Sequence, residues 1–114
     1  MLCEKPIALS NSELCELIEA RDRTGVVIGE AFMVASHPQW LRAREILQSG
    51  EIGAPRSILT AFSYFNRDPG NIRNNPAYGG GALLDIGCYP VFTSRFLLGE
   101  EPTSVQALIQ NDPD

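Results

Sequence analysis

The pattern of hydrophobic and polar positions predicts a helix and then a strand at the N-terminal end of the chain. Residues 10–24 are expected to be helical, because apolar side chains recur at helical spacing after a capping pair, Ser10 and Glu13. Gly25 supplies a stop, since glycine readily adopts the left-handed backbone that ends many helices. The β-branched and apolar run 26–34 then predicts a strand covered on both faces, as in a parallel sheet.

The same alternation of helix and strand continues along the chain. Pro38 opens a second predicted helix, which carries an apolar stripe and ends near Gly50. Residues 56–65 predict a long strand, in which the larger apolar and aromatic side chains share one face. A last strand is expected over residues 104–110.

A polar loop and a third helix lie between these two strands. Residues 66–78 are rich in Asn, Pro, Gly and Arg and are expected to form an ordered loop, where binding groups tend to sit. The helix should cover about residues 83–98 and end at Gly99. Pro90 lacks an N–H, so the regular part should begin close to Pro90, or the helix should kink there.

Helices that alternate with strands predict an α/β protein. Three strands alone would leave long unpaired edges, so we expect the sheet to need further strands and the chain to be cut at both ends.

Composition narrows the class of protein. The 114 residues suffice for one small domain. The sequence contains no run of about 18 apolar residues, which a membrane-spanning helix would need. The net charge of −5 argues against nucleic acid or an anionic membrane as the main partner, because both need a concentrated basic face. The N-terminus lacks the basic and apolar order of a signal peptide, so a cytoplasmic location is expected.

The metal-binding residue types do not form a metal pattern. The three cysteines, Cys3, Cys15 and Cys88, share no ligand spacing, and the single histidine, His37, is far from them in sequence. We therefore expect no metal site, and we expect the cysteines to be small buried apolar side chains in a reducing compartment. His37 precedes Pro38 and is assigned to a helix start rather than to catalysis.

Three ionisable residues are candidates for chemistry. Lys5, the only lysine, stands in CEKP, where a strand of an open α/β sheet would end and such sheets bind ligands, although taken alone it would be an ordinary solvated lysine. Asp85 and Tyr89 share one helix face at a spacing of four. The alternative is a core tyrosine beside a capping aspartate. Three preceding glycines, Gly79 to Gly81, favour the first interpretation, because they let a backbone approach a ligand.

Three stretches together resemble a known family. CEKPIALS, GEAFMVASHPQW and NIRNNPAYGGGALLDIGCYPV, in this order, look like the middle of a Gfo/Idh/MocA-type oxidoreductase, and the resemblance covers nearly all of the chain. Members are two-domain NAD(P)-dependent enzymes, with a Rossmann domain followed by an α/β domain on a large, mostly antiparallel sheet. Many carry histidine where this chain has Tyr89. The tyrosine resembles the subgroup of glucose–fructose oxidoreductases, dimeric dihydrodiol dehydrogenases and xylose dehydrogenases.

The resemblance implies a domain division and an activity. Residues 1–34 would be the end of the Rossmann-like domain and residues 35–114 the first part of the substrate and oligomerisation domain. The activity would be hydride transfer between NADP or NAD, with NADP favoured, and a sugar, polyol or diol hydroxyl. The G-x-G-x-x-G phosphate loop is not in this sequence. The alternative is therefore an inactive, self-associating packing module.

The resemblance also implies roles for individual residues. Tyr89 would be the general acid/base, Lys5 would hold positive charge beside its phenol, and Asp85 would orient the substrate hydroxyl or the lysine. Arg73 would contact substrate, although a solvated loop arginine is an equal alternative. The turn formed by Glu4, Lys5 and Pro6 would contact the cofactor. Further expectations are that Glu30 and Met33 line the same cleft and that the protein is a homo-oligomer.

Overall fold

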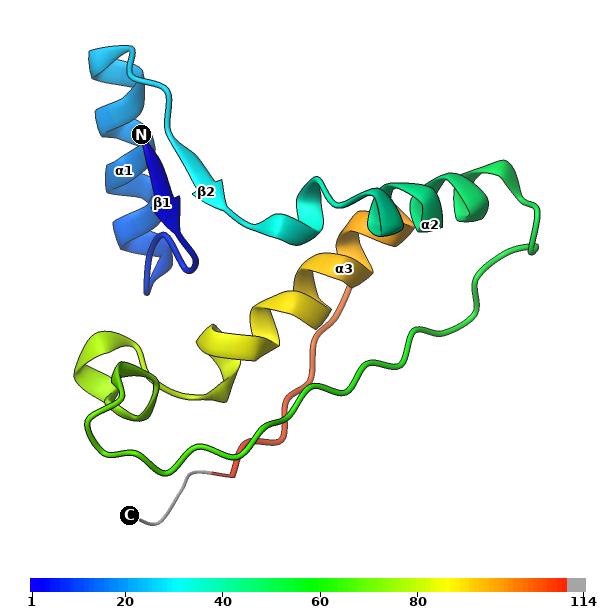
Figure 1. Cartoon of the computed structure of the whole chain (residues 1–114). Coiled ribbons are helices and arrows are strands. Elements are labelled where there is room, and N and C mark those ends of the chain that lie inside the picture. The colour runs from blue at the N-terminus through cyan, green and yellow to red at the C-terminus, as the bar shows by residue number, and fades with distance from the viewer. Residues whose placement is uncertain (111–114) are drawn as a thin grey trace.

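A short parallel β-sheet and a connecting helix form the N-terminal part of the fold (Figure 1). The structure is a computed structural model that describes residues 1–110. Strand β1 (Leu2–Glu4) pairs in parallel with β2 (Gly29–Ala31), and Cys3 lies opposite Glu30. Helix α1 (Asn11–Thr24) joins the two strands. This unit brings the two carboxyl ends of β1 and β2 to the same edge of the sheet.

The predicted strand over residues 26–34 is correct in direction but wrong in length and burial. Only Gly29–Ala31 pair with a neighbour, and Met33–Ala35 form a 3-10 turn instead. Val27 is exposed, whereas Val34 is buried. A strand is covered on both faces only when helices lie on both sides of its sheet. Within residues 1–110 that sheet has two strands, so each is an edge strand, and the exposure of Val27 shows that the run is not covered on both faces.

Local capping contacts define α1 as the sequence predicts. The Ser10 hydroxyl accepts a hydrogen bond from the N–H of Glu13 at 3.3 Å, and the Glu13 carboxylate accepts from the N–H of Leu9 at 2.8 Å. Gly25 ends the helix with φ 71°. These contacts satisfy N–H groups that have no partner within the first turn of a helix.

Helix α2 (Pro38–Ser49) also begins and ends where the sequence predicts. Pro38 occupies the first turn, and Nδ1 of His37 accepts a hydrogen bond from the N–H of Gln39 at 3.2 Å. Gly50 ends the helix with φ 74°. The assignment of His37 to a helix start is therefore confirmed.

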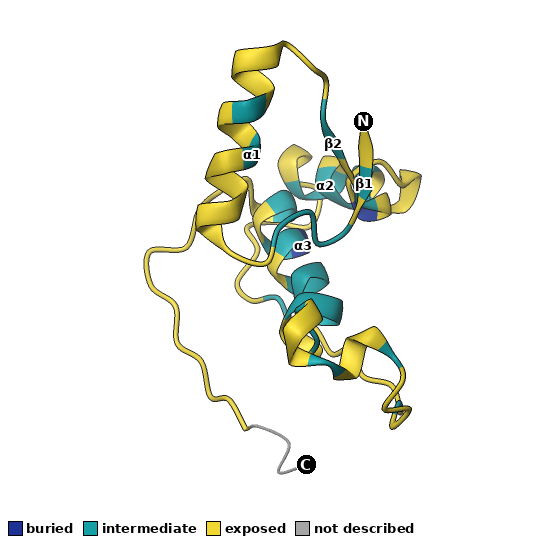
Figure 2. Ribbon diagram, turned by 90° about the vertical axis from the view of Figure 1, so that its left-hand side faces the viewer, coloured by how far each residue is buried: buried dark blue, intermediate teal, exposed yellow. Residues whose placement is uncertain are grey.

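Helix α3 (Cys88–Leu98) packs against α2 and carries much of the limited core (Figure 2). The rings of Phe92 and Phe96 stack at 5.4 Å, and the Arg44 guanidinium of α2 lies 4.3 Å from the Phe96 ring centre. Thr93 is buried and donates its hydroxyl hydrogen bond back to the Tyr89 carbonyl oxygen at 2.9 Å. Helix α3 is therefore the element against which α2 and the Met33–Ala35 turn pack.

The third predicted helix consists of two different parts. One π-helical turn, Leu83–Gly87, precedes α3, which ends at Gly99 with φ 69°. The predicted disturbance near Pro90 is therefore present, just before the proline. Pro90 has no N–H to donate to the preceding turn, so the regular hydrogen-bond ladder cannot pass through it. π-helical turns of this kind occur frequently at functional sites.

The two later predicted strands are wrong. Residues 56–65 and 104–110 run extended, but neither pairs into a ladder, and the large antiparallel sheet expected from the resemblance does not form within residues 1–110. A strand needs a partner for its N–H and C=O groups, and the described chain offers these segments none. Leu59 and Leu108 are therefore 92% and 101% exposed. The end of the predicted second domain, 111–114, lies outside the described residues.

Side-chain exposure corrects one further expectation. Cys15 is exposed, and Cys3 and Cys88 are only partly buried, so the expected burial of the cysteines is wrong.

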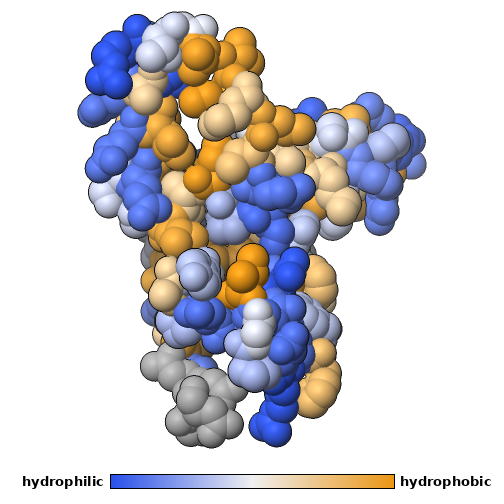
Figure 3. All heavy atoms as spheres, turned by 60° about the vertical axis from the view of Figure 1, so that its left-hand side comes forward, coloured by the Kyte–Doolittle hydropathy of each residue, from blue (hydrophilic) through white to orange (hydrophobic). Residues whose placement is uncertain are grey.

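Hydrophobic atoms reach the surface in several places between hydrophilic ones (Figure 3). No helix within the described part of the chain is long and apolar enough to cross a membrane.

Candidate active site

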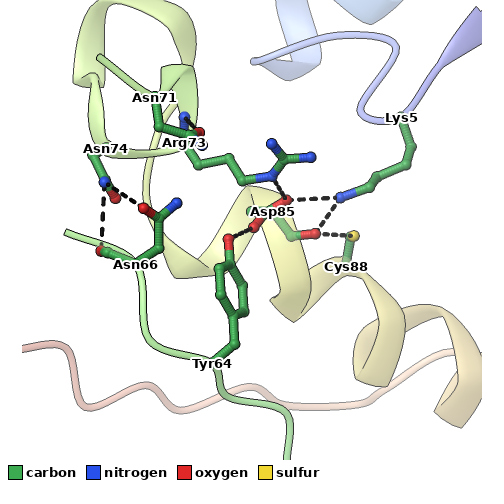
Figure 4. A network of polar contacts seen from close by, with 8 residues as sticks. All are labelled: Lys5, Tyr64, Asn66, Asn71, Arg73, Asn74, Asp85 and Cys88. Carbon is green, nitrogen blue, oxygen red and sulfur yellow. Dashed lines mark hydrogen bonds and ion pairs between the residues drawn. The ribbon is translucent and has the colours of Figure 1, made fainter. Parts of the chain in front are cut away.

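The carboxylate of Asp85 is the centre of a polar cluster (Figure 4). Oδ1 lies 3.1 Å from Lys5 Nζ and 3.1 Å from Arg73 Nε, while Oδ2 accepts a hydrogen bond from the Tyr64 hydroxyl. These donors come from the turn after β1, from the polar loop and from the extended segment 56–65. Three segments of the chain are therefore joined at one carboxylate, whose side chain is 14% exposed.

The turn after β1 directs Lys5 toward this carboxylate. The N–H of Ile7 donates to Oε1 of Glu30 at 2.8 Å, which fastens the turn to β2, and the Lys5–Pro6 peptide is cis. The Lys5 ammonium also donates to the main-chain carbonyl oxygen of Asp85. Pro90, five residues after Asp85, has no N–H and cannot give this carbonyl a π-helical hydrogen bond. The lysine therefore binds both the side chain and the backbone of Asp85.

Tyr89 lies beside Lys5 in an aromatic setting. The ammonium nitrogen is 5.2 Å from the centre of the Tyr89 ring, within the range of a cation–π contact. The same ring stacks on Phe32 at 5.1 Å and lies 5.6 Å from Phe62. These contacts hold the ring by its faces and edges, and the hydroxyl makes no hydrogen bond within residues 1–110.

The polar loop is ordered by its own asparagines and glycines. Asn71 caps the 3-10 turn Ile72–Asn74 by accepting from the N–H of Arg73 at 3.0 Å. Gly81 then donates its N–H to the Arg73 carbonyl oxygen at 2.8 Å. A Cβ on Gly80 would lie 2.6 Å from the backbone nitrogen of Asn75. At Gly80 the close neighbour is therefore the chain's own loop, a structural reason for glycine that the sequence interpretation did not consider.

The side chains of Lys5, Arg73, Asp85 and Tyr89 line an open cleft of about 460 Å³. Part of its wall is aromatic and part is basic or amide-bearing, with lining residues that include Phe62, Tyr64, Tyr89, Lys5, Asn71 and Arg73. A larger hollow of about 600 Å³ lies along α1, but it is lined mainly by surface carboxylates and an arginine and includes none of these residues. A molecule with an apolar ring face and several polar groups matches the first cleft.

Charge and hydrogen bonding tune the ionisable groups. Burial raises the pKa of Asp85, but the hydrogen bonds from Tyr64 and Lys5, the Lys5 charge and the hydrogen bond from Arg73 together outweigh it, so the pKa lies below its usual value. The hydrogen bond to Asp85 raises the pKa of the Tyr64 hydroxyl, and burial raises that of the Cys88 thiol. At neutral pH, Asp85 is thus an anion and Tyr64 a neutral donor.

Comparison with known proteins shows the family. Residues 40–114 match the family model described as the GFO/IDH/MocA C-terminal domain. The chain belongs to the Gfo/Idh/MocA family. This result confirms the resemblance carried by GGGALLDIGCYPV, which lies within the matched residues.

Relatives within the Gfo/Idh/MocA family are oxidoreductases. An uncharacterised oxidoreductase of Rhizobium meliloti is 48% identical over 113 residues, which are 99% of this chain and 34% of the relative. D-xylose 1-dehydrogenase (NADP(+)) 2 of Haloferax volcanii is 39% identical over 87% of this chain and 30% of its own length. Trans-1,2-dihydrobenzene-1,2-diol dehydrogenase of Xenopus laevis is 38% identical over 94% of this chain and 32% of its own. This Gfo/Idh/MocA chain thus spans about a third of the length of these relatives.

The structure of this Gfo/Idh/MocA chain brings most of the expected site residues together. Lys5, Asp85, Tyr89 and Arg73 all line the cleft. Glu30 and exposed Met33 do not line the cleft as expected, although Glu30 contacts the adjoining turn through Ile7. Within residues 1–110 no group of metal-binding side chains forms a site.

The sequence reasoning did not assign a role to Tyr64. The residue was placed on a strand face, but nothing local connects it with Asp85, 21 positions later. The available signal was its alternation with Phe62, which puts both side chains on one face of an extended segment.

The turn after β1 fits one end of a nicotinamide cofactor in this Gfo/Idh/MocA chain. Lys5 follows the carboxyl end of β1, Phe32 follows that of β2, and both meet Tyr89. Ligands of open α/β sheets bind outside the carboxyl ends of parallel strands. A Gly-rich phosphate loop is not among the 114 residues. The residues present therefore suit the reacting end of the cofactor rather than its pyrophosphate.

Proposed function

We propose that this chain supplies the proton-transfer side of an NAD(P)-dependent oxidoreductase that acts on a sugar, polyol or diol hydroxyl. The observation that supports it is the single Lys5 ammonium that contacts both the Asp85 carboxylate and the Tyr89 ring. The sugar and diol named in the Haloferax and Xenopus relatives favour this substrate class. NADP in the name of the Haloferax relative favours that cofactor, and the Glu4–Pro6 turn would hold its nicotinamide end.

Tyr89 acts as the general acid and base in this proposal. Its hydroxyl gives a proton to the carbonyl oxygen during reduction and takes one from the alcohol during oxidation. Positive charge beside a phenol stabilises the phenolate that forms as its proton leaves. Lys5 supplies that charge, and Asp85 holds Lys5 in place. A nicotinamide held at the Glu4–Pro6 turn would supply or take up the hydride.

Arg73 and the loop asparagines orient the substrate. Arg73 Nε is occupied by Asp85, and within residues 1–110 its two terminal nitrogens make no hydrogen bond, which leaves them to bind substrate hydroxyls. The Arg73 side chain is 50% exposed at the cleft. Phe62 and Tyr64 offer ring surface on which the apolar face of a sugar or cyclic diol can pack.

The test is cofactor-dependent turnover with a panel of sugars and diols. We expect Tyr89→Phe to lower kcat at least about 100-fold, as loss of a general acid does. Tyr78→Phe is the matched control, because Tyr78 is exposed and does not line the cleft. Wild-type turnover by Tyr89→Phe would remove Tyr89 from the role of acid and overturn the mechanism. An NADPH titration followed by nicotinamide fluorescence measures cofactor binding separately.

Self-association is a second candidate function, favoured by the exposed extended segments. Leu59 and Leu108 lie on segments 56–65 and 104–110, whose N–H and C=O groups have no ladder partner within residues 1–110. Unpaired strand edges with apolar side chains pair readily with other chains. Homo-oligomerisation would be compatible with catalysis. Only a folded chain with no cofactor binding and no turnover would make association its sole role.

A further inference from the structure

The two oxygens of Asp85 are held in different ways. Oδ1 is shared by two cations, Lys5 and Arg73, each at 3.1 Å. Oδ2 has a single donor within residues 1–110, the hydroxyl of Tyr64. Without that donor, Oδ2 would have no hydrogen bond within the described residues, and the cations on Oδ1 alone would hold the carboxylate. Tyr64 is therefore the second point of attachment of the carboxylate and limits its rotation about the Cβ–Cγ bond.

Tyr64 belongs to the same extended face as another site residue. Phe62, two positions earlier, places its ring 5.6 Å from Tyr89. Residues two apart on an extended segment point to the same side. One face of segment 56–65 thus contacts both the acid candidate Tyr89 and the carboxylate beside it. The Tyr64 side chain is half-exposed, so its hydroxyl could bind water and does not need Asp85 as a hydrogen-bond partner.

We propose that Tyr64 is a positioning residue for the reaction, whose hydroxyl fixes the Asp85 carboxylate so that Asp85 holds the Lys5 ammonium over the face of Tyr89. This inference rests on the proposed function. Tyr64 acts through Asp85. It does not donate the reaction proton, because its own proton is engaged by an anion.

The charged and titratable groups around Asp85 define the expected pH effect. They are Lys5 on the turn after β1, Arg73 on the loop, Tyr64 on the extended segment, and Cys88 and Tyr89 on α3. Removing a hydrogen bond to the ionised form raises the pKa of a carboxyl group. In Tyr64→Phe, Asp85 should therefore be protonated at higher pH than in the wild type, and Lys5 should lose its anchor there.

The experiment compares Tyr64→Phe with Tyr78→Phe in the intact protein. We expect Tyr64→Phe to lower kcat about tenfold, in line with loss of one hydrogen bond to a charged group, and to change KM less than about twofold. The acidic limb of its kcat profile should move to higher pH. The carboxyl carbon resonance of Asp85, followed by NMR without ligand, should titrate at higher pH as well. Tyr78→Phe should change none of these quantities.

A double-mutant cycle with Asp85→Asn separates a positioning role from a structural one. If Tyr64 acts through Asp85, adding Tyr64→Phe to Asp85→Asn should cause no further loss of kcat. Tyr64→Gln, which keeps a neutral donor, provides a second variant should Tyr64→Phe lose its native circular dichroism. In Tyr64→Gln, Asp85 should titrate at a pH closer to that of the wild type than in a variant that lacks any donor, such as Tyr64→Leu.

The outcomes distinguish this inference from the proposed function. An unchanged pH profile and an unchanged Asp85 titration in Tyr64→Phe, with Tyr89→Phe inactive, would overturn the role of Tyr64 alone. Additive losses in the double-mutant cycle would do the same. Normal turnover by Tyr89→Phe would overturn both.

Discussion

The ammonium of Lys5 lies 3.1 Å from the carboxylate of Asp85, although the two residues are 80 positions apart. Both side chains are largely shielded, at 15% and 14% exposure. The pair joins the turn after β1 to the π-helical turn before α3. Its geometry therefore depends on how these two parts of the chain pack, and it places the one lysine of the sequence beside Tyr89.

Replacing Lys5 tests the charge on which proton transfer depends. Lys5→Met keeps a long side chain but removes the cation that faces Tyr89 and Asp85, so we expect kcat to fall at least about 100-fold. Measurement of kcat and KM with the preferred substrate checks this. Arg56→Met is the control, since Arg56 is an exposed residue that does not line the cleft. Near-normal kcat in Lys5→Met would exclude the proposed use of its charge.

Arg73 should affect substrate binding more than the chemical step. Lysine at this position keeps the charge but loses the planar fork that can hold Asp85 and a substrate hydroxyl together. We expect Arg73→Lys to raise KM about tenfold and to change kcat by a smaller factor. Steady-state kinetics across the sugar and diol panel provides the measurement. Arg67→Lys, on the same polar loop but away from the cleft, should behave as the wild type. An unchanged KM in Arg73→Lys would exclude the proposed contact between Arg73 and substrate, and the contact with Asp85 would be its only role at the site.

Stability should depend on pH through Asp85. Because the folded-state pKa of Asp85 lies below the usual value of 3.8, ionised Asp85 stabilises the fold above that value, and the stabilisation is lost as pH falls through the lower folded-state pKa. The difference in unfolding free energy between wild type and Asp85→Asn should be constant near neutral pH and should shrink below pH 3.8. Urea unfolding across this range measures it. A difference that grew on acidification would have the wrong sign for a carboxylate held ionised by Tyr64, Lys5 and Arg73.

Gly80 should be intolerant of a side chain. Alanine would bring its Cβ to 2.6 Å and 2.7 Å from the backbone nitrogen and oxygen of Asn75, so the loop must move. We expect Gly80→Ala to cost about 1–3 kcal/mol and to lower kcat/KM, because the displaced loop carries Arg73. Thermal unfolding and kinetics check both effects. Gly29→Ala, whose Cβ would meet only Leu2 at 3.7 Å, is the control, and equal stability of the two variants would contradict the packing role of Gly80.

Helix boundaries were predictable from the sequence because their determinants are local. Ser10, Glu13 and Gly25 bracket α1, and His37, Pro38 and Gly50 bracket α2. The disturbance near Pro90 was predictable for the same reason, although its form, a π-helical turn, was not. Segments 56–65 and 104–110 were predicted as strands from side-chain alternation. A ladder also needs a neighbour, which a local pattern cannot supply.

The site was predictable to the extent that it follows from one helix face and one motif. The spacing of Asp85 and Tyr89 and the isolated Lys5 pointed to three side chains that now share a cleft. The contact between Tyr64 and Asp85 depends on the path of an extended segment, so the alternation of Phe62 and Tyr64 could place both on one face but could not reveal their partner. The same holds for Gly80, where the residue type signalled a close approach but not which backbone approaches.

Association through the extended segments should be sensitive to charge. Leu59 and Leu108 are almost fully exposed on segments with unpaired backbone groups, so pairing with a second chain would bury them. We expect the mass of the wild type measured by light scattering to increase with concentration, and the Leu59→Lys, Leu108→Lys variant to remain a monomer, because a lysine on an edge strand opposes pairing. Ile52→Lys places a lysine at an exposed apolar residue outside both segments and should associate as the wild type does. A folded wild-type chain that stays monomeric at all concentrations would remove association as a function of these segments.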